Sequence, residues 1–122
     1  MKPSVFVIEN NPMYSLFLTM KLDDMFNYTT HFFPSAEEAL ENMHLKPGIL
    51  ILDYMLDGMN GLEATKKIKQ AHPNIKIIVV SAQQEPQVAA DLMSAGAYCY
   101  IQKDKDAPQK IVDAVVKITQ GK

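Results

Sequence analysis

The stretch ILIL at residues 49–52, followed directly by Asp53, indicates the fold of this chain most directly. Its four residues are apolar without interruption, whereas a strand with one wet face would alternate apolar and polar residues. Consecutive apolar residues are typical of parallel strands that are covered on both faces. The run VFVI at residues 5–8 has the same character. We therefore interpret both runs as central strands of a parallel sheet.

Three more runs have the composition of strands. They occupy residues 28–33, 75–80 and 97–101 and are dominated by β-branched and aromatic residues, with the first of them the weakest. Such residues fit the pleated, half-buried surface of a sheet. The sequence therefore predicts five strands.

Each predicted strand is followed by a segment of helical length with a start signal. Two of the signals are capping boxes, in which Ser35 and Asn60 each precede a glutamate by three residues. Proline marks three further starts, at Asn11–Pro12, at Pro86 and at Asp106–Pro108. The first helix carries an apolar series at Met13, Leu16, Phe17 and Met20, and we expect the methionines mostly to pack on helix faces.

Strand and helix alternate five times along the chain. This order predicts an α/β protein with a doubly wound five-stranded parallel sheet and helices on both faces. Right-handed crossovers leave few topologies, of which we favour the flavodoxin-like order 2-1-3-4-5, a (βα)5 arrangement. No linker or repeat interrupts the alternation, so residues 1–122 are expected to form a single domain.

Composition narrows the class of protein. The chain has 122 residues, 48% of them apolar, and a net charge of −2, which gives no electrostatic basis for binding nucleic acid or an anionic membrane. Its single cysteine, Cys99, excludes an internal disulfide and fits a reducing compartment. The longest apolar runs are about five residues, against the ~20 that span a bilayer. We expect a soluble, cytoplasmic protein without a signal peptide.

Polar residues follow the predicted strands at the edge where parallel sheets bind ligands. They are Glu9 and Asn10 after the first strand, Asp53 after the third, Ser81 after the fourth and Lys103 after the fifth. Carboxylate and amide oxygens suit Mg²⁺, and a carboxylate can take a phosphoryl group as an aspartyl phosphate. Alone, each residue is more simply read as a cap, turn or solvated side chain. Their placement after four alternating strands favours one shared site.

The residues that follow the strands resemble the receiver family of two-component response regulators. The resemblance rests on four segments in order, and it covers essentially the whole chain. The segments are VIENNP at 7–12, DYMLDGMNG at 53–61, Ser81-Ala82, and Gly96-Ala97 with Tyr100 and Lys103.

The resemblance implies a phosphorylation switch. Asp53 would accept a phosphoryl group from a sensor histidine kinase or a phosphotransfer protein. Glu9, Asn10, Asp53 and the backbone carbonyl of Met55 would surround Mg²⁺ as the cofactor. Lys103, together with Ser81 and Ala82, would bind the phosphate.

The resemblance also implies an output. Tyr100 would turn inward, and the face of the fourth helix, fifth strand and fifth helix would then change partners, with a homodimer as one option. An effector protein, or an output domain beyond Lys122 acting on transcription, would read that face. Receivers support their own phosphorylation and dephosphorylation, which we do not count as an independent enzyme activity.

Two positions depart from the family pattern and keep an alternative open. Asn10 stands where the family usually has aspartate, so we expect weaker Mg²⁺ affinity. Asp57 stands where proline is usual, so the loop is expected to be less rigid. Asn10 favours a pseudo-receiver that works as a protein-binding module without phosphorylation. A flavin or dinucleotide enzyme is disfavoured, because Glu9 would repel a flavin phosphate and no glycine-rich fingerprint is present.

Overall fold

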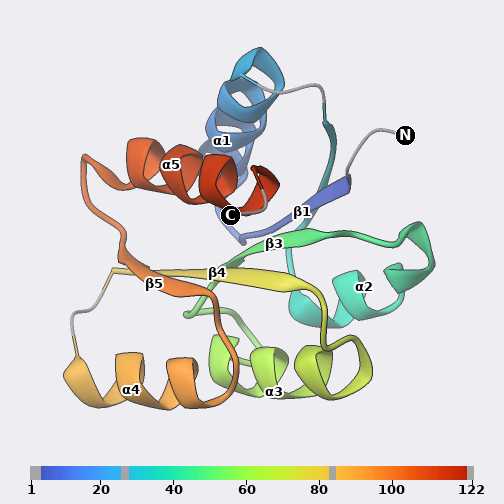
Figure 1. Cartoon of the computed structure of the whole chain (residues 1–122), viewed down its shortest axis with the longest axis vertical. Helices are drawn as coiled ribbons and strands as arrows, with labels where there is room; N and C mark the ends of the chain where they lie inside the picture. The colour runs from blue at the N-terminus through green and yellow to red at the C-terminus, as the bar shows by residue number, and fades with distance from the viewer. Residues whose placement is uncertain (1–3, 26–27, 83–84, 121–122) are drawn as a thin grey trace.

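The computed structural model describes residues 4–25, 28–82 and 85–120, and it alternates strands with helices as the sequence predicts (Figure 1). Within these residues, five strands form one parallel sheet. A short 3-10 helix, η1, is the one element that was not expected. The elements are β1 (Ser4–Ile8), α1 (Pro12–Met25), β2 (Thr29–Phe33), α2 (Ala36–Leu40), η1 (Met43–Leu45), β3 (Ile49–Asp53), α3 (Gly61–Ala71), β4 (Lys76–Ser81), α4 (Pro86–Ser94), β5 (Cys99–Gln102) and α5 (Ala107–Thr119).

The strand order is β2-β1-β3-β4-β5, which confirms the predicted flavodoxin-like topology. β1 and β3 are in register from Val5 with Ile49 to Ile8 with Leu52, so both strands finish at the same level. β4 pairs with β3 in the same direction, with Val80 opposite Asp53. The register therefore brings the residues that follow β1, β3 and β4 to one edge.

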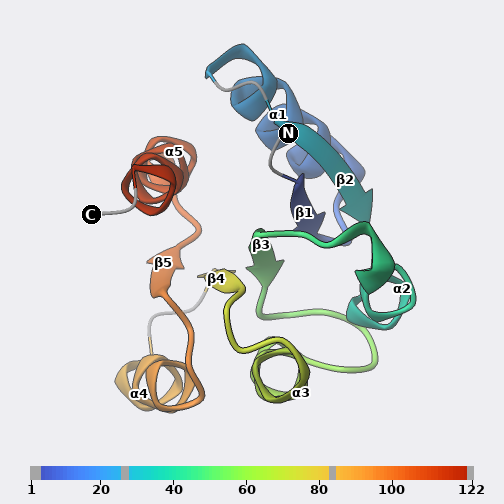
Figure 2. The ribbon, with the colours of Figure 1, turned by 45° about the vertical axis from the view of Figure 1, so that its right-hand side comes forward.

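The sheet separates two apolar layers, because neighbouring residues of a strand point to opposite faces. Phe6 and Leu50 pack with residues of α2, α3 and α4, such as Ile68 and Leu92. Figures 1 and 2 show α1 and α5 on the other face, where the second layer lies. Its residues include Val5, Ile51, Leu18, Leu22, Ile111 and Val115. Both faces of β1 and β3 are thus buried, which explains their uninterrupted apolar sequences.

The predicted helix starts are confirmed in position. Ser35 Oγ accepts a hydrogen bond from the backbone N–H of Glu38 at 3.2 Å, and Asn60 Oδ1 accepts one from Glu63 at 2.9 Å. Asp106 precedes α5, but its side chain makes no capping hydrogen bond to the described residues. Gly96 ends α4 with a φ of +108°, which favours glycine.

The expected packing face of α1 is wrong. Met13, Leu16, Phe17 and Met20 are half to three-quarters exposed, whereas Leu18 and Leu22 are buried against the sheet. The reason is that residues 12–20 contain no charged side chain, so the sequence marks no polar face on this helix. Among the described residues, no helix combines the length and apolarity that a membrane crossing requires.

Candidate functional site

A lysine and two carboxylates meet at the carboxyl edge of the sheet. Lys103, which follows β5, places its Nζ 2.7 Å from Glu9 Oε1 and 3.6 Å from Asp53 Oδ2. Glu9 and Asp53 are almost fully buried, with 3% and 7% of their surfaces exposed. Residues 94 positions apart in the chain therefore form one compact charged cluster.

Backbone hydrogen bonds hold the loops of this cluster. Glu9 Oε2 accepts the N–H of Asn11 at 2.9 Å, and Asp53 Oδ1 accepts the N–H of Met55 at 3.1 Å. The N–H of Lys103 donates to the carbonyl of Ser81 at 2.7 Å, which ties the loop after β5 to the end of β4. Each charged side chain is thus fixed at its own strand end.

Burial and the nearby Glu9 carboxylate raise the pKa of Asp53 to about 6. The ammonium of Lys103 and the N–H of Met55 act in the opposite direction, but they compensate only in part. Burial is the larger cause, and repulsion between the two neighbouring carboxylates adds to it. The site therefore carries negative charge that its single ammonium does not neutralise fully.

The other expected metal ligands lie around this pair. Asn10 is exposed between Glu9 and α1, and Met55 is exposed in the loop after β3. No three acidic, histidine or cysteine side chains converge among residues 4–25, 28–82 and 85–120. Position 10 carries an amide, so it adds no carboxylate beside Glu9.

The expected phosphate-binding and switch residues occupy different environments. Ser81 ends β4, is 1% exposed and is tied to Lys103 through its carbonyl. Ala82, the next residue, is exposed. Tyr100 lies in β5, opposite Val79, and its half-buried side chain packs on the apolar layer beneath α3 and α4. The side chains of Glu9, Asp53 and Lys103 are in direct contact, whereas Asn10 and Ala82 are exposed and Tyr100 packs on the apolar layer.

Tyr14 is a site residue that the sequence analysis missed. The ammonium of Lys103 lies 4.3 Å from the centroid of its ring. Burial, with help from Glu9, Asp53 and Asp104, raises the pKa of Tyr14 to about 12. The available signal was its place in the first turn of the helix that begins beside Glu9. Because α1 is apolar on several faces, that signal did not say which residue faces the site.

Gly61 explains how the loop after Asp53 closes. Its N–H donates to the carbonyl of Tyr54 at 2.9 Å. A Cβ at this position would lie 2.7 Å from the Tyr54 Cα, closer than real side chains approach a backbone. The loop can therefore return to the start of α3 only if position 61 carries no side chain.

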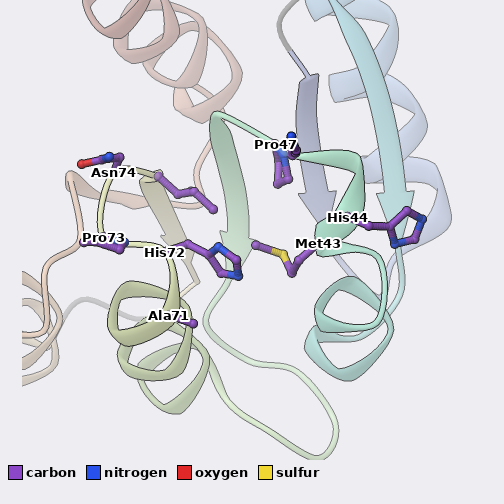
Figure 3. A pocket seen from close by; sticks show the side chains of 9 residues that line it. Met43, His44, Pro47, Ala71, His72, Pro73 and Asn74 are labelled. Atoms are coloured by element: carbon purple, nitrogen blue, oxygen red, sulfur yellow. The ribbon is translucent and has the colours of Figure 1, made fainter.

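A pocket of about 470 Å³ lies elsewhere, between the segments that lead into β3 and β4 (Figure 3). His72 points toward Met43 across it, whereas His44 points away on the other side. Its lining includes no carboxylate. Because these segments precede the strands, the pocket lies at the opposite end of the sheet from Asp53 and is separate from the charged cluster.

Comparisons with known proteins agree on one family. The family model described as response regulator receiver domain matches residues 5–116. Response regulator protein VraR of Staphylococcus aureus strain NCTC 8325 is 36% identical over 88 residues, which are 71% of this chain and 42% of VraR. Response regulator GacA of Pseudomonas viridiflava is 39% identical over 70 residues, 57% of this chain and 33% of GacA. The matched regions therefore cover less than half of these relatives.

A solved structure of a response regulator has the same fold as this chain. A crystal structure of a two-component response regulator of the LuxR family from Aurantimonas sp. SI85-9A1 superposes with a TM-score of 0.88. The match covers 100% of this chain and 88% of that one at 24% identity, so it supports the fold alone. The family match over nearly the whole sequence carries the assignment: this chain belongs to the response regulator receiver domain family.

Proposed function

We propose that this receiver domain is a phosphorylation switch that accepts a phosphoryl group on Asp53. The observation that carries the proposal is the position of Lys103, whose ammonium lies between the Glu9 and Asp53 carboxylates. An ammonium so placed can stabilise the negative oxygens of an arriving phosphoryl group.

The phosphoryl group moves from an oxygen or nitrogen atom of the donor to a carboxylate oxygen of Asp53. A carboxylate oxygen of Asp53 forms a bond to phosphorus while the bond from phosphorus to the donor breaks and its electron pair leaves with the donor. The Met55 N–H occupies Oδ1, and Lys103 approaches Oδ2 at 3.6 Å. After transfer, Lys103 and Ser81 would hold the phosphoryl oxygens.

The donor set at this edge fits Mg²⁺. Glu9, Asn10, Asp53 and the Met55 carbonyl offer the hard oxygens that this ion prefers. The two buried carboxylates repel each other, as the raised pKa of Asp53 reflects, and a divalent cation would relieve that repulsion. When bound, Mg²⁺ supplies charge neutralisation for the incoming phosphoryl group.

The switch would act through the face of α4, β5 and α5. Tyr100 belongs to β5 and Lys103 follows that strand directly. New phosphate contacts at Lys103 would therefore act on the strand at the centre of that face. The donor would be a histidine kinase or phosphotransfer protein, and the reader an output domain or an effector. On this proposal the domain is a regulated acceptor and not an independent enzyme.

Intact mass spectrometry after incubation with acetyl phosphate and MgCl₂ tests the proposal. We expect one phosphoryl adduct on the unmodified chain and none on Asp53→Asn. The matched control is Asp57→Asn, which removes an exposed aspartate from the same loop and should leave the adduct intact. Loss of the adduct in both variants, or in neither, would contradict Asp53 as the acceptor.

A second candidate function is a binding module that works without phosphorylation. Asn10 favours it, because an amide replaces one of the acidic ligands expected for Mg²⁺. Absence of an adduct at high MgCl₂, both in the unmodified chain and in Asn10→Asp, would support this candidate. An adduct that appears only in Asn10→Asp would mean that position 10 has switched the acceptor off.

A further inference from the structure

Three of the groups near the ammonium of Lys103 differ in kind. Glu9 and Asp53 are anionic and approach Nζ at 2.7 and 3.6 Å. The third is the ring of Tyr14, whose centroid lies 4.3 Å from Nζ. A cation at this distance from a ring is attracted by its electron-rich face.

The start of α1 fixes the place of this ring. Asn11 Oδ1 accepts hydrogen bonds from the N–H groups of Met13 and Tyr14, at 3.0 and 3.2 Å, and so caps the helix. The Tyr14 side chain packs against the apolar layer between the sheet, α1 and α5. The helix start that follows Glu9 therefore places the ring beside the lysine.

The anionic neighbours of Lys103 have other tasks under the proposed function. Glu9 and Asp53 are both expected to share their oxygens with Mg²⁺, and Asp53 also becomes an aspartyl phosphate. Sharing with Mg²⁺ weakens the attraction that holds the ammonium before transfer, and after transfer the phosphoryl oxygens take the place of the free Asp53 carboxylate. The ring takes part in neither change, so its attraction persists through them.

We propose that Tyr14 is a positioning residue that holds the Lys103 ammonium at the phosphoacceptor through the face of its ring. This inference rests on the function proposed above and deepens it. The ring acts on the phosphoryl group only through Lys103.

The hydroxyl of Tyr14 has no part in this role. It is buried and has no hydrogen-bond partner among the described residues. Like any tyrosine hydroxyl it is protonated at neutral pH, so it offers no anion to the lysine. Phenylalanine should therefore replace Tyr14 fully, whereas leucine keeps only an apolar side chain of comparable bulk.

A first experiment reads the contact without any phosphorylation. In ¹H–¹³C NMR spectra, the ring should shift the Lys103 ε-methylene protons upfield in the unmodified chain and in Tyr14→Phe. The shift should disappear in Tyr14→Leu. The control Tyr28→Leu removes a tyrosine from the same apolar layer and should retain it. Lys103 signals that do not change in Tyr14→Leu would overturn the proposal.

A second experiment measures the rate of adduct formation with acetyl phosphate over a range of MgCl₂. At saturating Mg²⁺ we expect Tyr14→Leu to react about fivefold more slowly, with Tyr14→Phe and Tyr28→Leu close to the unmodified chain. The Mg²⁺ concentration for half-maximal rate should stay unchanged, since Tyr14 offers the metal no ligand. Equal slowing in Tyr14→Phe and Tyr14→Leu would overturn a role of the ring.

The two experiments fail separately. If the unmodified chain forms no adduct while the Lys103 shift depends on Tyr14, the phosphoacceptor proposal fails and the placement of the lysine stands. If the adduct forms and neither the shift nor the rate depends on Tyr14, the phosphoacceptor proposal stands and the positioning role fails. Thermal melting of each variant shows whether it is folded under the assay conditions.

Discussion

Asp53 is a buried carboxyl group whose burial disfavours its charged form. Its pKa is about 6 in the folded chain, against an ordinary value of 3.8. The folded state therefore holds this proton more tightly than the unfolded state does. Its stabilising contribution is complete below the ordinary pKa and is lost as pH rises through about 6. At neutral pH, Asp53 is consequently an ionised group whose environment favours the neutral form.

Asp53→Asn is therefore expected to stabilise the fold above pH 6. We expect a gain of about 1–2 kcal/mol in the free energy of unfolding at pH 7.5, shrinking toward zero near pH 4. Urea unfolding at the two pH values measures the difference. Asp57→Asn is again the control, and a gain in Asp53→Asn that does not depend on pH would contradict the assigned electrostatic cause.

Asn10 is a second residue at which a change of charge should alter both Mg²⁺ affinity and stability. Asn10→Asp adds a carboxylate beside Glu9, so we expect Mg²⁺ to bind on the order of tenfold more tightly. The same substitution should lower the stability of the metal-free protein, because the added charge repels Glu9 and Asp53. A calorimetric titration with MgCl₂ tests the affinity. Equal affinities in the two proteins would mean that position 10 is not a ligand.

Gly61 makes a steric prediction that has a built-in control. Gly61→Ala would force a Cβ to within 2.7 Å of the Tyr54 backbone, whereas a Cβ at Gly48 would meet nothing within 4 Å. We expect Gly61→Ala to lower the free energy of unfolding by about 1–3 kcal/mol and Gly48→Ala to change it little. Comparable losses in chemical denaturation would contradict the close approach to Tyr54 as the cause at position 61.

The sequence predicts some site residues better than others for a simple reason. Glu9 and Lys103 come directly after a strand, Asp53 is the last residue of one, and the ends of parallel strands meet by geometry. Tyr14 comes from a helix, where its direction depends on the rotation of the whole element. No sequence pattern on α1 fixes that rotation, so the ring beside Lys103 emerges only from the three-dimensional structure.

At the scale of the element, α1 shows how a helix can be predicted while its packing is not. Its start at Asn11–Pro12 is correct, but the apolar series at Met13, Leu16, Phe17 and Met20 faces outward. In α5, by contrast, charged residues occupy one side, and the predicted positions Ile111, Val112 and Val115 are buried. Charged residues on the solvent-facing side of a helix are thus what allows its buried face to be predicted from the sequence.

Two neighbouring positions on α1 test the corrected face. Leu18 is 2% exposed and Leu16 is 55% exposed. Truncating a buried leucine leaves a cavity, so Leu18→Ala should lower the free energy of unfolding by about 2–4 kcal/mol. Leu16→Ala should change it by less than about 1 kcal/mol. The reverse order in urea denaturation would restore the face that the sequence pattern suggested.

At the scale of the whole molecule, topology was the most predictable feature. Alternating strands and helices with right-handed crossovers leave few sheet orders, and uninterrupted apolar sequences at residues 5–8 and 49–52 identify the two central strands next to the site. β2 and β5 lie at the edges, where one side of each strand has no partner strand among the described residues. The weak strand signal at residues 28–33 follows from the edge position of β2.

The reactivity of the Cys99 thiol measures how often α5 separates from the edge of the sheet formed by β5. The thiol packs on the apolar layer between the sheet and α5, and burial raises its pKa from 9.0 to about 11, while Lys117 lowers it. Only the thiolate reacts with alkylating agents. Because few thiolates exist at pH 8, we expect iodoacetamide to modify the folded protein at least about tenfold more slowly than the urea-unfolded chain.

The pH dependence of this reaction distinguishes a raised pKa of the thiol from steric exclusion of iodoacetamide. In the folded protein the rate should rise with pH from 7 to 10 without a plateau, because the thiol titrates only near pH 11. In urea the rate should level off above pH 9, the ordinary pKa of the group. Mass spectrometry of quenched samples measures both profiles. A plateau that begins just above pH 9 in the folded protein, as in urea, would mean that α5 leaves the sheet often enough for the thiol to titrate in water.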